Sequence, residues 1–198
     1  MVNVFDKDSI SKEETYLIAP CGIYCGACDL FLRKGKKLAG ELHEILDGFN
    51  ILDVGKVLLG CKQEEIEIFL RLLKEYSNIS ECPGCSGGGS PNCPSHCPMK
   101  LCTKGKGYLT CAECDLMPCE MTEKDFKNPL KSTPGMLALI TKRYNHFNID
   151  NLKRIREIGY RMFIDEMQKK VKNGFMTSAV ISEEMVFTEV RHKLKKRN

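Results

Sequence analysis

The residues of this chain best suited to chemistry are its cysteines, twelve in a sequence of 198 residues. Eight of them fall between residues 82 and 119, in a segment that is also rich in glycine and proline. Because these residues favour turns, the segment is predicted to lack long regular elements. It holds few bulky apolar side chains, so metal binding by thiolates is predicted to order it. The predicted metal ligands are Cys21, Cys25, Cys28, Cys61, Cys82, Cys85, Cys93, Cys97, Cys102, Cys111, Cys114 and Cys119.

An even number of cysteines would also allow disulfides, and the cellular compartment decides between disulfides and metal sites. The N-terminal sequence carries Asp6 and Asp8 and lacks the apolar stretch of a signal peptide. No apolar run approaches the roughly 18 residues that a membrane span requires. We therefore expect a cytoplasmic protein with no membrane association. There thiols stay reduced, and closely spaced cysteines bind metal more often than they form disulfides.

The formal net charge of +4 does not indicate a nucleic-acid partner. That count treats every cysteine as neutral, whereas a metal-bound cysteine has lost its proton. If all twelve bound three divalent ions as thiolates, the balance would become slightly negative. A protein partner is therefore expected before a nucleic acid.

The first cysteine cluster has the spacing C-x3-C-x2-C and contains Cys21, Cys25 and Cys28. The small residues between these sulfurs allow the backbone to wrap closely around a metal centre and donate N–H groups to thiolates. Cys61 precedes an amphipathic helix predicted over 62–76, whose N-terminus would stabilise a thiolate. Cys61 is therefore either a fourth ligand of this cluster or an ordinary buried thiol.

Two C-x2-C pairs in the central segment, Cys82 with Cys85 and Cys111 with Cys114, are separated by 25 residues. This is near the spacing at which two knuckles share one tetrahedral ion, so we predict that these four cysteines form one site. The remaining cysteines form a second group by elimination, with His96 as an alternative ligand: Cys93, Cys97, Cys102 and Cys119.

The sequence APCGIYCGACDLF at residues 19–31 resembles the opening signature of a cysteine-rich family of unknown function found in anaerobic bacteria and archaea. The later hallmarks of that family also occur in this chain, so the resemblance runs from about residue 17 to about 170. They are Cys82-Pro83-Gly84-Cys85, Cys97-Pro98 followed by Cys102, Lys106-Gly107, Cys111-x2-Cys114 closing on Pro118-Cys119-Glu120, and a helix at 151–159. Met117 stands where the family usually has an aromatic residue, and Cys61 and Cys93 are additions. The resemblance implies a metal-binding fold and no particular activity.

Apolar periodicity predicts helices over 30–49, 62–76, 133–146 and 151–172, and a last helix after Ser182, with 51–60 as an apolar connector. The fold class expected is mainly α with irregular cysteine-rich metal-binding loops, with room for a small α+β part among the loops. Residues 1–119 form the predicted metal-binding region with two helices. Residues 120–198 form a helical region that packs on it, within one structural domain.

Three functions fit these residues. The favoured one is a structural or interaction module with zinc sites, because zinc is redox-silent and four thiolates close its tetrahedral site. An electron-transfer protein with a [4Fe-4S] cluster is the alternative, since thiolates suit both metals. A radical S-adenosylmethionine enzyme using Cys21, Cys25 and Cys28 fits less well, because the chain shows no repeating strand–helix pattern for a barrel. No catalytic constellation is identified, and whether the protein is an enzyme stays open.

Overall fold

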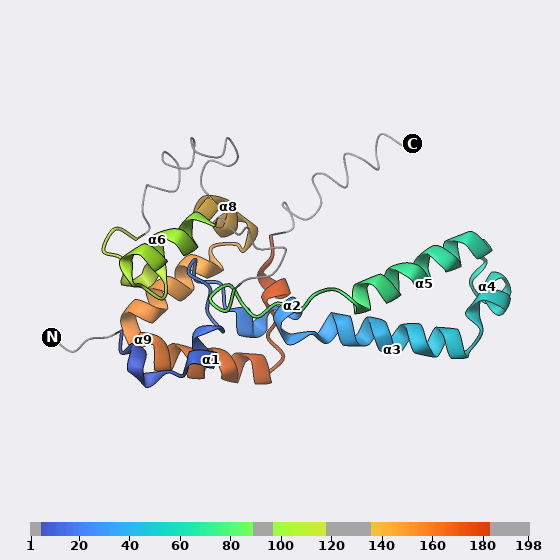
Figure 1. Cartoon of the computed structure of the whole chain (residues 1–198), viewed down its shortest axis with the longest axis horizontal. Coiled ribbons are helices and arrows are strands. Elements are labelled where there is room, and N and C mark those ends of the chain that lie inside the picture. Colours follow the sequence, from blue (N-terminus) through green and yellow to red (C-terminus); the bar gives the residue numbers. More distant parts are fainter. Residues whose placement is uncertain (1–4, 89–96, 118–135, 183–198) are drawn as a thin grey trace. The chain divides into compact units, whose positions relative to one another are not determined.

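The computed structural model describes residues 5–88, 97–117 and 136–182. In these residues the regular structure consists of α-helices and short 3-10 turns, with one isolated antiparallel bridge between Ile18 and Tyr24 (Figure 1). The predicted mainly α fold is confirmed. No helix in the described ranges combines the length and apolar character needed to cross a membrane.

The chain divides into two compact units. One, here called the arm, is Leu32–Glu81; the other, here called the body, combines Met1–Phe31 with Cys82–Asn198. The body is therefore assembled from segments on either side of the arm in the sequence. The boundary predicted between residues 119 and 120 lies outside the described residues and remains a prediction.

The arm consists of three helices, α3 (Lys34–Gly48), α4 (Ile51–Leu59) and α5 (Gln63–Ser77). α3 and α5 are antiparallel, and the amino group of Lys36 near the start of α3 donates to the carbonyl of Ile79 after α5 at 3.0 Å. Ile51, Ile66 and Leu70 form a small core. The stretch 51–60, predicted as a connector, instead forms helix α4 as far as Leu59. Gly60, in the left-handed conformation, caps the C-terminus of that helix.

The longest helix of the body is α9 (Phe147–Lys172), which follows α8 (Met136–Arg143). Four of its apolar side chains are almost completely buried: Leu152, Ile155, Phe163 and Ile164. α9 begins earlier than the predicted 151–172 helix, with His146 rather than Asp150 at its N-cap, and its helical conformation is interrupted at Gly159 (φ 77°). Gly159 tolerates this positive φ because it has no Cβ.

The described part of the body also contains shorter elements. They are η1 (Lys7–Ser9), α1 (Lys12–Thr15), η2 (Cys25–Ala27), α2 (Asp29–Leu32), α6 (Pro98–Lys106), η3 (Cys111–Glu113) and η5 (Thr177–Val180). The described part of the central segment is partly helical and contributes side chains to the core, while its ordering by metal remains a prediction. Pro98 is the first residue of a nine-residue helix, a position where proline favours helix formation. Met99, Ala112 and Met117 are buried in the core of the body.

Candidate metal centre

The first cysteine cluster forms a tight loop closed by its own backbone. The Ala19 N–H donates to the Ile23 carbonyl at 2.8 Å, and the Cys28 N–H donates to the Cys25 carbonyl at 2.8 Å. Gly22 has a φ of +91°, and a Cβ added there would lie 2.2 Å from the Asn148 carbonyl oxygen. The glycine is therefore needed both for the turn and for close approach to α9.

Two asparagines of α9 hold this loop by its carbonyl groups. The side-chain amide of Asn148 donates to the Cys21 carbonyl at 3.3 Å, and that of Asn151 donates to the Gly22 carbonyl at 2.8 Å. Both asparagines are buried. Because a buried carbonyl without a partner is destabilising, these bonds favour one position of Cys21 relative to α9.

The loop that carries Cys82 and Cys85 lies against the first one. The Ser86 hydroxyl donates to the Ile18 carbonyl at 3.0 Å. Gly84 has a φ of +81°, and a Cβ there would approach the Tyr16 carbonyl oxygen to 2.3 Å. These contacts bring the second cysteine segment beside the first, although about 60 residues separate them in the sequence.

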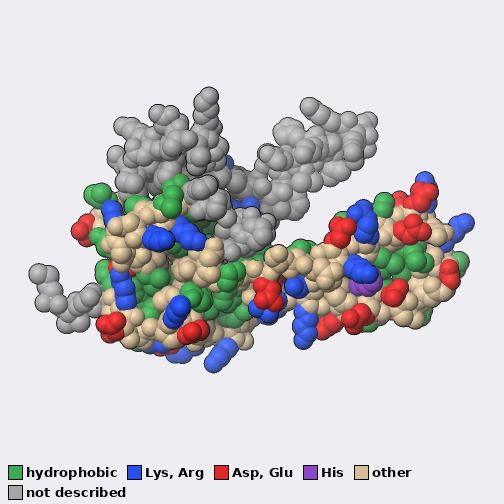
Figure 2. All heavy atoms as spheres, in the orientation of Figure 1, with side chains coloured by type: hydrophobic (Ala, Val, Ile, Leu, Met, Phe, Trp, Pro, Cys, Tyr) green, Lys and Arg blue, Asp and Glu red, His purple; other side chains and the backbone are tan. Residues whose placement is uncertain are grey.

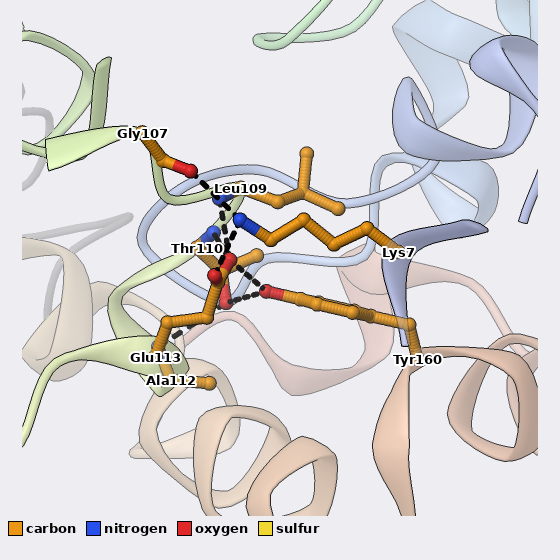
Figure 3. A network of polar contacts seen from close by, with 7 residues as sticks. All are labelled: Lys7, Gly107, Leu109, Thr110, Ala112, Glu113 and Tyr160. Carbon is orange, nitrogen blue, oxygen red and sulfur yellow. Dashed lines mark hydrogen bonds and ion pairs between the residues drawn. The ribbon is translucent and has the colours of Figure 1, made fainter. Parts of the chain in front are cut away.

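A third cysteine segment, residues 110–117, joins the same region through the Cys111 N–H, which donates to the Pro20 carbonyl at 2.9 Å. Figure 3 shows the polar network that shapes this turn. The Glu113 carboxylate accepts from the Tyr160 hydroxyl at 2.8 Å and pairs with the Lys7 amino group at 2.6 Å. Its side chain is only 7% exposed. Burial, and secondarily the neighbouring Glu113, raise the pKa of Tyr160 well above its usual range.

The far side of this turn is held by one arginine of α9. The Arg156 guanidinium donates to the Ala112 carbonyl at 2.7 Å, to the Met117 carbonyl at 3.4 Å and to the Cys114 carbonyl. One planar side chain thus satisfies three carbonyls of the segment that carries Cys111 and Cys114. These contacts tie the segment to α9.

Five cysteines take part in the core of the body. Cys21, Cys25 and Cys111 are buried in that core, and Cys85 and Cys97 are half-buried and pack against it. Burial raises the pKa of the Cys21 thiol to about 12, and the nearby thiols of Cys85 and Cys97 add to the effect. Three cysteines that the sequence spacing assigns to three different groups, Cys21, Cys85 and Cys97, thus contribute to the same hydrophobic core.

The remaining described cysteines are not part of that core. The Lys106 amino group donates to the Cys114 sulfur at 3.4 Å, which raises the lysine pKa, and Cys102 contributes to the same effect. Cys28 and Cys82 are half-buried. Cys61 is in the arm, where its thiol lies 3.6 Å from the Leu59 carbonyl oxygen and packs against the arm core.

None of the ten cysteines within the described ranges forms a disulfide. Cys93 and Cys119 lie outside those ranges, as does His96. Among the described residues, no group of three or more His, Cys, Asp or Glu side chains has the arrangement of a metal site. The predicted ligand sets consequently remain predictions.

The sequence analysis did not identify the polar side chains that position these loops: Glu113, Asn148, Asn151, Arg156 and Tyr160. Their partners are mostly backbone carbonyls or residues more than 40 positions away. The one local signal is the pair Asn148 and Asn151, spaced three apart on a helical face that is otherwise apolar. Such a pair indicates buried hydrogen bonds without naming their partners.

Comparison with known proteins gives one match. The model of a family described as a protein of unknown function, DUF3795, matches residues 17–124, more than half of the chain. No curated protein and no solved structure matches the chain significantly.

Proposed function

The chain belongs to the DUF3795 family, and we propose that it is a metal-binding protein in which Cys21, Cys85 and Cys97 hold a zinc ion. The observation that supports this proposal is that these three thiols, from three separate segments, all contribute to the core of the body. The described side chains do not by themselves have the arrangement of a metal site, so binding would have to draw the thiols together. A fourth thiolate would come from Cys25 or Cys111, which are buried in the same core.

The chemistry of this donor set fits zinc. Four thiolates around one ion make a closed structural site, and zinc has no redox activity of its own. An ion at Cys21 would also counter the cost of a buried thiolate, because ligands lose their protons on binding metal. The ion would cross-link three segments of the body, of which the Cys21 loop is already held by α9, and so act as a structural clamp for an interaction module.

The proposal is tested by metal analysis of protein purified without oxygen. We expect bound zinc, no colour, and loss of one ion per chain from each of the variants Cys21→Ser, Cys85→Ser and Cys97→Ser. Cys61→Ser, in the arm, is the matched control and should retain all metal. Protein without metal would contradict the proposal, as would loss of the same ion from the control.

Metal analysis of Cys85→Ser, Cys97→Ser and Cys114→Ser distinguishes the proposed group of ligands from the group predicted by cysteine spacing. Cys85 belongs to both, whereas Cys97 belongs only to the first and Cys114 only to the second. If Cys114→Ser loses the ion that Cys85→Ser loses, and Cys97→Ser retains it, the spacing rule is correct and the proposed grouping is wrong. Brown protein with iron and acid-labile sulfide would instead favour the iron–sulfur alternative, because thiolates bind either metal.

A further inference from the structure

One face of helix α3 in the arm exposes a continuous apolar stripe. Leu38, Leu42, Ile45 and Phe49 follow one another at steps of four, three and four residues, and each is between 41% and 65% exposed. This is the spacing of the a and d positions of a coiled coil, where apolar side chains pack between neighbouring helices. None of the four belongs to the core formed within the arm.

Helix α5 carries a second stripe, Phe69, Leu72 and Tyr76, each between 40% and 51% exposed. Ala39 of α3 and Leu70 of α5 are among the buried residues packed between the two helices. On each helix the stripe lies about a quarter turn around the helix axis from these packed residues, and the rotational sense is the same on both helices. Because α3 and α5 are antiparallel, this places both stripes on one side of the pair. We call these seven residues the arm face.

An apolar surface of this kind is unusual on an isolated monomer and indicates an interaction site. Figure 2 shows apolar side chains on the arm interspersed with charged ones. The charges on the side of the α3 stripe away from α5 are ordered. Lys34 and Lys37 come first, and Glu41 and Glu44 follow.

This order runs against the dipole of α3, since acidic side chains favour a helix N-terminus and basic ones its C-terminus. The first turn of α3 has no acidic residue and its last turn no basic one. A second α3 running antiparallel would place the basic half of each helix beside the acidic half of the other. A parallel partner would bring like charges together, which is unfavourable.

We propose that the arm face is a dimer interface, and that its occupant is the arm of a second copy of this chain with the two α3 helices antiparallel. Such an interface is isologous: the same patch serves both partners around a twofold axis. The α3 and α5 helices of the two arms then bury their stripes together. This inference is independent of the proposed metal site, which lies in the body.

The first test is the mass of the full-length protein by sedimentation equilibrium, up to about 100 µM, a range that detects weak self-association. We expect the wild-type protein to dimerise and Leu42→Glu to weaken self-association at least about tenfold, because it buries an unpaired charge. Val57→Glu, at an 87% exposed position of α4 outside the arm face, is the matched control and should dimerise like the wild type. A monomeric wild type, or an unaffected Leu42→Glu, would overturn the proposal.

A charge exchange tests the antiparallel arrangement. Lys34→Glu with Lys37→Glu makes this side of α3 wholly acidic, and Glu41→Lys with Glu44→Lys makes it wholly basic. Each double variant alone should be monomeric, with helicity unchanged by circular dichroism, whereas an equimolar mixture should form a heterodimer. Dimers in either variant alone, or none in the mixture, would overturn the predicted charge pairing.

Discussion

The arm and the body are stabilised in different ways. The arm is made of helices whose apolar periodicity can be seen in the sequence, with a small core of Ile51, Ile66 and Leu70. In the body, side chains of one helix bind carbonyls of distant loops, as Asn148 does at Cys21 and Arg156 at Cys114. The comparison shows that the cysteine loops depend on α9 for their position, and that a metal ion in the body would add a clamp that the arm lacks.

Metal removal should produce the largest difference between the body and the arm. With a chelator under reducing conditions, we expect body amides such as those of Ala19 and Cys111 to lose protection from hydrogen exchange. Amides of α3 and α5 should keep theirs. The expected effect is large, since structural zinc supplies on the order of 10 kcal/mol in small domains. Equal loss of protection in both regions, or loss in neither, would contradict the distinction.

Replacement of a glycine by alanine, once in the body and once in the arm, should give a smaller difference in stability. Gly22→Ala should destabilise the protein by about 2–4 kcal/mol, because of its positive φ and its contact with the Asn148 carbonyl. Gly48→Ala at the end of α3 meets nothing within 4 Å and should be neutral or stabilising by up to about 1 kcal/mol. The free energy of unfolding in denaturant measures both. Similar values for the two variants would show that the loop is not held as described.

Loss of one hydroxyl should have the smallest effect. Tyr160→Phe removes the hydrogen bonds of Tyr160 with Glu113 and Thr110, and should cost about 1–2 kcal/mol. Tyr108→Phe keeps the aromatic ring beside Lys106 and is the control; it should change stability by less than about 0.5 kcal/mol. Equal effects of the two substitutions would argue against a stabilising network at Glu113.

This tyrosine also predicts a pH dependence. The pKa of Tyr160 is raised in the folded protein, chiefly by burial, above its ordinary value of 10.0. Above pH 10 the unfolded chain therefore loses a proton that the folded chain keeps, so stability falls as pH rises. Tyr160→Phe should lack this part of the alkaline loss. An identical alkaline slope in the wild type and the variant would contradict the assignment.

The sequence predicts the local part of this structure well. The helix predicted over 62–76 corresponds to α5 at Gln63–Ser77, because its apolar spacing reflects packing along one face. Other boundaries depend on the fold. α9 starts at Phe147 and breaks at Gly159, where the backbone adopts a conformation that only the surrounding structure stabilises.

The neighbourhood of the cysteines was less predictable. Spacing relates cysteines that are close along the chain, whereas the loops of Cys21, Cys85 and Cys111 are held together by contacts of Ser86 and Pro20 with distant segments. These contacts involve backbone carbonyls. Because every residue has one, the sequence does not indicate which carbonyl accepts a hydrogen bond. The family resemblance was drawn from about residue 17 to about 170, and membership of a cysteine-rich family of unknown function is confirmed by the DUF3795 match over residues 17–124.

X-ray absorption at the edge of the bound metal tests the central claim most directly. If Cys21, Cys85 and Cys97 hold zinc with a fourth thiolate, the first shell should consist of sulfur alone at about 2.3 Å. Loss of this sulfur-only zinc signal in Cys97→Ser, with the signal unchanged in Cys61→Ser, would place Cys97 in that shell. A wild-type first shell of nitrogen and oxygen, or a protein without metal, would contradict the account.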